Sequence, residues 1–110
     1  MEVDKFLPLS EASYYVLLAL DQAAHGYAVM QQVETASGGQ VRIGAGTLYG
    51  AFATLERQGL IEKTGEQDRR KYYRMTAQGR AVAAAQLARL ETMVAHGRAV
   101  LDRTSKGVAA

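Results

Sequence analysis

The residues best suited to chemistry are three consecutive cations, Arg69, Arg70 and Lys71, in a short polar stretch of the chain. Guanidinium and ammonium groups recognise phosphates, so the chemistry that this cluster suggests is binding to a polyanion. Glu66 and Asp68 lie beside the cluster and partly neutralise it, and a run of charges is commonly a solvated surface. Both interpretations stay open here, and phosphate contact is favoured because of the element that precedes the cluster.

That preceding element is an amphipathic helix, expected over about residues 47–58 after Gly46. Leu48, Phe52 and Leu55 recur at helical spacing and predict its core face. The opposite face is small or polar, and such a face can lie close to the base edges in a major groove. The residues predicted on it are Thr47, Gly50, Thr54 and Arg57.

Tyr49, at the start of the same helix, has two interpretations. Its hydroxyl suits a phosphate contact, and its ring would equally fill a gap between neighbouring helices. Arg42 and Arg57 either reach backbone phosphates or are surface charges, and Lys63 and Arg74 are weaker candidates of the same kind. The predicted DNA-contact residues are Arg42, Thr47, Tyr49, Gly50, Thr54, Arg57, Lys63, Arg69, Arg70, Lys71 and Arg74.

Several classes of site have no support in the sequence. There is no cysteine, and the two histidines, His25 and His96, lie far apart without the carboxylate partners of a metal motif. No serine has the surroundings of a catalytic nucleophile, and residues 44–46 lack the lysine and hydroxyl of a phosphate-binding loop. We therefore expect no catalytic residue, no metal and no cofactor, and an enzyme is the least supported class.

The length, net charge and apolar runs of the chain limit the class of protein and its expected location. The chain has 110 residues and a formal net charge of +2, which suits one small domain and is weak evidence for nucleic acid in itself. No apolar run approaches the roughly 18 residues that span a bilayer. The amino terminus mixes acidic and basic residues ahead of no long apolar segment, so no secretion signal is expected. These observations predict a cytoplasmic protein that does not contact a membrane.

Elements on both sides of the helix over 47–58 would hold it in place. Helices are expected over about residues 11–23 and 27–36, with Ser10 as N-cap of the first and a glycine stop after Ser37. A stripe of Tyr27, Met30 and Val33 is expected to face the core from the second helix.

A hairpin is expected after the helix over 47–58, with strands over about 60–64 and 71–75 and a loop over 65–70. Its alternation places Tyr73 inward and Tyr72 outward. Residues 40–43 are β-prone, and pairing of this stretch with the hairpin is one possibility.

The last helix is expected over about residues 77–103, with Thr76 as its N-cap. Apolar and small residues recur along it at alternating spacings of four and three, which is the seam of a heptad repeat. Nothing later in the chain can cover that seam, so we expect a homodimer joined through it. The predicted interface residues are Leu87, Leu90, Val94 and Leu101.

The order of elements predicts a mainly α fold with a small β-hairpin (α+β), a winged helix-turn-helix followed by a long dimerisation helix. The expected parts are residues 1–76 for DNA binding, 77–103 for dimerisation and 104–110 as a flexible tail. The chain resembles the PadR-type transcriptional regulators, specifically their short subclass with a single C-terminal helix. The matching pieces are His25-Gly26-Tyr27, Gly46-Thr47-Leu48-Tyr49, Leu55-Glu56-Arg57-Gln58-Gly59-Leu60-Ile61, Arg69-Arg70-Lys71-Tyr72-Tyr73-Arg74-Met75-Thr76 and Gly79-Arg80.

This resemblance implies a dimeric repressor of its own or a neighbouring gene, with double-stranded operator DNA as partner and, in some members, a small aromatic or amphipathic effector. Residues that would line an effector cavity at the dimer interface are Phe6, Tyr14, Tyr15 and Met93, and an ordinary interface core is the alternative. Ala45 departs from the family pattern, which often has proline there. A winged-helix protein-interaction module without DNA affinity is the rival function, because a fold does not fix a function.

Overall fold

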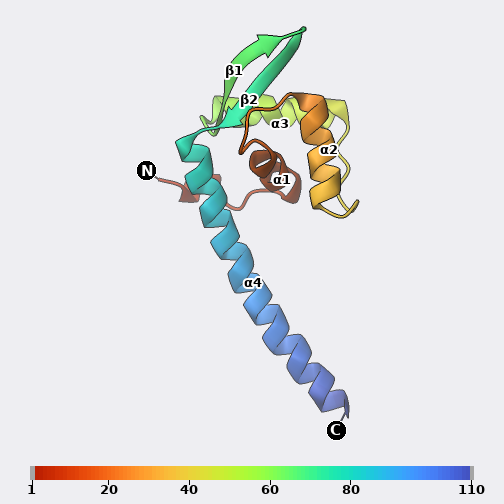
Figure 1. The fold of residues 1–110 in the computed structure, drawn as a ribbon. Helices are drawn as coiled ribbons and strands as arrows, with labels where there is room; N and C mark the ends of the chain where they lie inside the picture. Colours follow the sequence, from red (N-terminus) through yellow and green to blue (C-terminus); the bar gives the residue numbers. More distant parts are fainter. Residues whose placement is uncertain (1, 110) are drawn as a thin grey trace.

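A computed structural model describes the backbone of residues 2–109 and the side chains of residues 2–103. A short 3-10 helix, η1 (Asp4–Phe6), precedes four α-helices and one hairpin. In Figure 1, α1 lies at the centre of the body, with α2, α3 and the start of α4 around it and the hairpin projecting beyond α3. The elements are α1 (Glu11–Ala19), α2 (Gly26–Ala36), α3 (Ala45–Arg57), β1 (Ile61–Gln67), β2 (Arg70–Met75) and α4 (Ala77–Ala109). The predicted α+β architecture is confirmed.

The core forms around α1, as its apolar composition requires. Val16, Leu17 and Leu20 are fully buried, and Ser10 caps the helix by accepting a hydrogen bond from the Ser13 amide. The predicted core face of α3 is confirmed, because Leu48, Phe52 and Leu55 are all buried. The predicted stripe of α2 is wrong in part. Tyr27 is 57% exposed, and Val29 takes its place beside Val33 in the core.

The hairpin of β1 and β2, called the wing below, is longer than predicted. Its strands pair up to Gln67 and Arg70, so only Asp68 and Arg69 form the turn instead of a loop over 65–70. Both turn residues have positive φ, 52° and 66°, which is the pattern of a type I′ turn. One irregularity interrupts the pairing between Lys63 and Gly65.

The free edge of β2 is joined to the segment that connects α1 and α2. Ala24 and Tyr73 exchange two backbone hydrogen bonds of 3.0 Å, and the Met75 amide donates to the Leu20 carbonyl at 2.8 Å. These bonds explain why α1 ends at Ala19 and not at the predicted residue 23. The backbone from Leu20 onward pairs with the wing and so cannot continue the helix.

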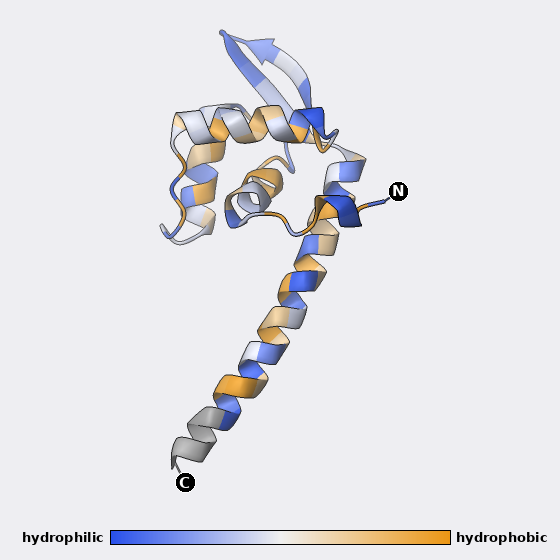
Figure 2. Cartoon of the chain, turned by 180° about the vertical axis from the view of Figure 1, so that it is seen from behind, coloured by the Kyte–Doolittle hydropathy of each residue, from blue (hydrophilic) through white to orange (hydrophobic). Residues whose placement is uncertain are grey.

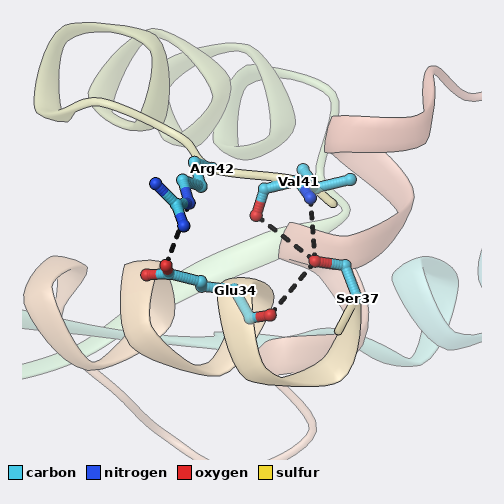
Figure 3. A network of polar contacts seen from close by, with 4 residues as sticks. All are labelled: Glu34, Ser37, Val41 and Arg42. Carbon is cyan, nitrogen blue, oxygen red and sulfur yellow. Dashed lines mark hydrogen bonds and ion pairs between the residues drawn. The ribbon is translucent and has the colours of Figure 1, made fainter. Parts of the chain in front are cut away.

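Residues 40–43 do not pair with the wing, and that expectation is wrong. The Ser37 hydroxyl accepts a hydrogen bond from the Val41 amide at 2.9 Å, and its own proton lies within reach of the Glu34 and Val41 carbonyls (Figure 3). Because Ser37 is buried, these bonds tie the segment to the end of α2 and override its β propensity.

The first turn of α4 is pressed against the end of α3. The Thr76 hydroxyl accepts from the Gly79 amide at 3.0 Å, as predicted for a cap, and donates to the Gly59 carbonyl at 2.7 Å. A Cβ on Gly79 would overlap the Leu60 carbonyl oxygen and lie 3.0 Å from its carbon. Only glycine therefore allows this approach. Further along, the buried Gln86 accepts a hydrogen bond from the Leu9 amide at 2.9 Å.

Beyond Gln86 the helix leaves the body. Figure 2 shows hydrophobic and hydrophilic residues alternating along this free part of α4. Leu87, Val94 and Leu101 are 48%, 52% and 68% exposed. The helix α4 continues to Ala109, past the predicted end at residue 103, and the side chains of the predicted tail, 104–110, lie outside the described residues.

Candidate nucleic-acid interface

The outer face of α3 carries the predicted small and polar residues. Thr47, Gly50, Thr54 and Arg57 are all exposed and follow one another at helical spacing. The Arg57 guanidinium donates to the Thr54 hydroxyl at 3.4 Å, so these two side chains lie side by side on that face. A Cβ on Gly50 would meet no atom within 4 Å, which leaves the surface beside it open.

The wing beside α3 carries its cations in two groups. Arg69, at the turn, and Lys71 are exposed. Lys63 is paired with Glu66 at 3.0 Å, and this hydrogen bond and charge lower the pKa of the Glu66 carboxyl. Arg74 is exposed near the base of the wing. Part of the positive charge predicted for the wing is therefore neutralised within the hairpin, and its most cationic part is the run Arg69, Arg70 and Lys71 that follows Asp68.

Aromatic contacts fix the wing to α3. The Phe52 ring lies 4.8 Å from the Tyr73 ring, centroid to centroid, and 6.1 Å from the Tyr49 ring. Tyr73 packs on the core as predicted, and burial is the main cause that raises the pKa of its phenol. Tyr72 was expected outward, and it is half-buried with its ring edge against the His25 ring at 5.3 Å.

A hollow of about 340 Å³ lies where α2, α3 and the wing meet. The start of α2 and the start of α3 form one side, and the tip of the wing forms the other. The lining residues are His25, Gly26, Tyr27, Tyr49, Arg69, Arg70, Lys71 and Tyr73. The sequence had pointed to Tyr49 and the three cations, and the structure brings them together. It adds the His25-Gly26-Tyr27 segment, whose place in the motif was the one available signal.

Tyr49 fills space between helices, as one of its two interpretations predicted, and its phosphate contact stays a prediction. The residue is 56% exposed, yet its hydroxyl lies against the backbone of Gly26, where an added Cβ would stand 2.8 Å from the hydroxyl oxygen. The ring therefore covers the start of α2 and keeps its polar end at the hollow.

His25 connects α2 with the wing. It is the N-cap of α2, where its Nδ1 accepts from the Ala28 amide at 3.4 Å. Its Nε2 lies 3.3 Å from Nη1 of Arg70. Sequence reasoning gave His25 a structural or surface role because it lacked the partners of a metal motif, and its neighbour Arg70 is 45 residues away along the chain.

Arg42 stands apart from these groups. Its Nε lies 3.1 Å from Oε1 of Glu34, and Figure 3 shows the pair beside the Ser37 network. Both side chains are largely exposed, so the ion pair is weak and leaves the guanidinium near α3 partly neutralised.

Three of the four residues predicted to line an effector cavity lie together, and the fourth does not. Tyr14, Tyr15 and Met93 line a second hollow of about 590 Å³ between α1, the segment before it and α4, together with Leu90 and Gln86. Phe6 is not among its lining residues and packs against the main core instead. Met93 is 66% exposed, so one wall of this hollow is open along the free part of α4.

Among the residues that the structure describes, no group of three or more histidine, cysteine or carboxylate side chains is placed to hold a metal ion. No described helix combines the length and the apolar character needed to cross a membrane.

The chain is similar in sequence to a curated protein of unknown role. The chain is 40% identical over 72 residues to an uncharacterized 37.1 kDa protein in transposon TN4556 of Streptomyces fradiae, a match that covers 64% of this chain and 20% of that one. The chain thus spans about a fifth of the length of this curated relative.

Two solved structures share the fold at higher coverage. A PadR family transcriptional regulator from Eggerthella lenta is 29% identical, with a TM-score of 0.67 over 82% of this chain and 77% of its own. A transcriptional regulator from Clostridium thermocellum is 26% identical, with a TM-score of 0.66 over 83% and 89%. Residues 16–85, which include the helix-turn-helix, the wing and the start of α4, match the family described as transcriptional regulator PadR-like. The chain belongs to this family of PadR-like transcriptional regulators.

Proposed function

We propose that the protein is a dimeric, sequence-specific DNA-binding regulator that represses its own or a neighbouring gene. The observation that carries this proposal is the position of the small, polar face of α3 beside the cationic tip of the wing. A major groove admits one helix, and the neighbouring backbone presents a row of phosphates.

In this arrangement α3 enters the groove and the wing follows the backbone. Thr47, Gly50 and Thr54 leave space for base edges, and threonine hydroxyls accept or donate to several bases. Arg69, Arg70 and Lys71 contact phosphates and fix the register of the helix. Arg57, Arg42, Lys63 and Arg74 add backbone contacts at the edges of the same surface, which is consistent with their exposure.

The free part of α4 supports the dimer. An amphipathic helix that leaves the body with Leu87, Val94 and Leu101 exposed has an apolar stripe without a cover among the described residues. A second copy of the same stripe covers it by knobs-into-holes packing. Two α3 helices related by a twofold axis would then read half-sites about one helical turn, or 34 Å, apart.

An effector would bind in the hollow lined by Tyr14, Tyr15 and Met93. Its aromatic and thioether groups suit a flat apolar compound, and the second subunit would close its open side. Such a compound releases DNA only if it binds better to the spacing of α3 helices that DNA does not accept.

The test is fluorescence anisotropy with DNA from upstream of the protein's own gene, against scrambled DNA, at low and physiological salt. We expect tight binding to the native DNA alone at physiological salt. Equal, salt-sensitive binding to both DNAs would contradict sequence specificity at that site. No binding at either salt would favour the protein-interaction module, for which the α3 face would be a peptide-binding surface.

A further inference from the structure

His25 has two hydrogen-bond donors beside its ring. The Ala28 amide nitrogen lies 3.4 Å from Nδ1, and Nη1 of Arg70 lies 3.3 Å from Nε2. A neutral imidazole has one acceptor nitrogen and one N–H, and a guanidinium only donates. The ring therefore cannot accept from both neighbours, and one of the two contacts is between donors.

The position of His25 at the helix start indicates which contact that is. Its backbone is extended, with φ −95° and ψ 168°, which is the conformation of an N-cap residue. An N-cap side chain accepts from an amide of the first turn, and Nδ1 does so here. The proton then resides on Nε2, so the Nε2–H group and the Arg70 guanidinium point toward each other.

Two converging donors require an acceptor between or beside them. The hollow at this point is lined by Arg69 and Lys71 as well as Arg70, and no residue of its described lining is acidic. The Tyr49 hydroxyl contributes a further donor at its edge. An oxyanion could accept hydrogen bonds from Nε2–H and from the guanidinium together, which would remove the repulsion between the two donors.

We propose that His25 and Arg70 hold one phosphodiester group of the DNA backbone, with His25 as a neutral Nε2–H donor. This inference rests on the proposed function and assigns to it a contact from the start of α2. One phosphate would then bind to the helix-turn-helix and to the wing at once, and this shared ligand would fix the angle between them.

The two donors differ in charge, and this difference makes the site testable. Neutralisation of a phosphate by a cation contributes roughly 0.9 to the slope of log K against log salt for duplex DNA. Arg70 supplies such a charge, and a neutral histidine does not. Loss of His25 should therefore weaken binding without changing the salt slope.

The variant that isolates the Nε2 donor is His25→Ser. Serine is a good N-cap, so it keeps an acceptor for the Ala28 amide while it removes the Nε2 donor that faces Arg70, together with the ring contact to Tyr72. We expect a protein that still folds, with an affinity for the upstream DNA at least about tenfold lower and an unchanged salt slope. Arg70→Ala should lower the affinity and reduce the slope by roughly 0.9 per subunit. The double variant should lose little more than the worse single variant, because both residues hold the same phosphate.

A second measurement needs no DNA. Inorganic phosphate is titrated into the free protein while the ring nitrogens of His25 are followed by NMR. We expect saturable shifts with the proton on Nε2 in the wild type and no response in Arg70→Ala. Absence of any response in the wild type, or His25→Ser binding DNA as tightly as the wild type, would overturn the site while leaving DNA binding intact. A His25 response to phosphate in a protein that binds no DNA would support the site and refute the proposed function.

Discussion

The hydroxyl of Tyr49 lies against the backbone of Gly26, so that a Cβ at position 26 would stand 2.8 Å from the phenol oxygen. The same added atom would lie 3.1 Å from Cδ2 of Leu48. The first turns of α2 and α3 therefore meet through a side chain with no room for another atom beneath it. Because Tyr49 is 56% exposed, its ring can rotate away if that space is filled.

Gly26→Ala is expected to displace Tyr49 and to lower DNA affinity, and to destabilise the fold by about 1–3 kcal/mol. The exposed Tyr49 can move away from the added Cβ, but the fully buried Leu48 cannot do so without disturbing the core. Anisotropy and thermal unfolding measure the two effects.

Tyr49→Phe should weaken DNA binding at an unchanged melting temperature; a large loss of stability in that variant would show that the hydroxyl serves packing alone.

Gly79→Ala is expected to destabilise the fold by about 1–3 kcal/mol or more. The added Cβ overlaps the Leu60 carbonyl, which is backbone and cannot rotate aside. Gly50→Ala is the matched control, since no atom lies within 4 Å of its added Cβ and alanine should stabilise that helix by roughly 0.5–1 kcal/mol. Denaturant unfolding compares the two, and equal stabilities would contradict the close packing of α4 on Leu60.

Arg69→Gly should separate the two roles of the wing turn. Arg69 has a φ of 66°, where a side chain is strained by roughly 1–2 kcal/mol and glycine is not. The variant should therefore be at least as stable as the wild type, while its salt slope for DNA falls by roughly 0.9 per subunit. Loss of affinity for one sequence only would instead indicate that Arg69 reads bases.

Leu90→Asp with Val94→Asp is expected to yield a monomer or an unfolded chain, because two charges on each α4 would enter the apolar seam. Sedimentation equilibrium and circular dichroism measure the outcome. The control is Ala88→Asp with Thr92→Asp, which has the same charge and spacing on the opposite, exposed face of α4. A dimer that survives the first pair would refute the seam.

The pair of Asp21 and Arg80 predicts a pH effect of known sign. A hydrogen bond and charge from Arg80 lower the pKa of the Asp21 carboxyl below its usual 3.8. A carboxyl with a lowered folded-state pKa stabilises the fold above about pH 4, and this contribution is lost as the pH falls through the folded value. Both side chains are more than half exposed, so the pair contributes little to the free energy of unfolding. The pKa of the Asp21 carboxyl is therefore a better measure of the pair than protein stability. NMR titration of Arg80→Ala should place the pKa of Asp21 nearer 3.8, and no change would refute the pair.

Periodicity along the chain predicted what depends on local pattern. The spacing of Leu48, Phe52 and Leu55 was sufficient to place the core face of α3, and the cap signals of Ser10 and Thr76 marked two helix starts. These features depend on residues within one or two turns of each other, so no tertiary information was needed.

Features that depend on distant residues could not be predicted in this way. The end of α1 is set by backbone bonds to β2, more than 45 residues later in the chain. The site at His25 requires Arg70 to be brought across the same distance. Pairing of residues 40–43 with the wing was predicted as one possibility from their local β propensity. The hydrogen bond from the Val41 amide to the buried Ser37 hydroxyl outweighs that propensity. The predicted DNA contacts themselves stay predictions.

The backbone bonds between Ala24 and Tyr73 also affect the thermodynamics of association. They tie the base of the wing to the body before any partner arrives, so the hairpin does not have to be ordered on binding. Its conformational entropy is lost during folding, and a regulator built in this way should bind with a small entropic penalty from the wing. Amide exchange would show this as slow exchange at Tyr73 and Met75 in the free protein, with faster exchange confined to the turn.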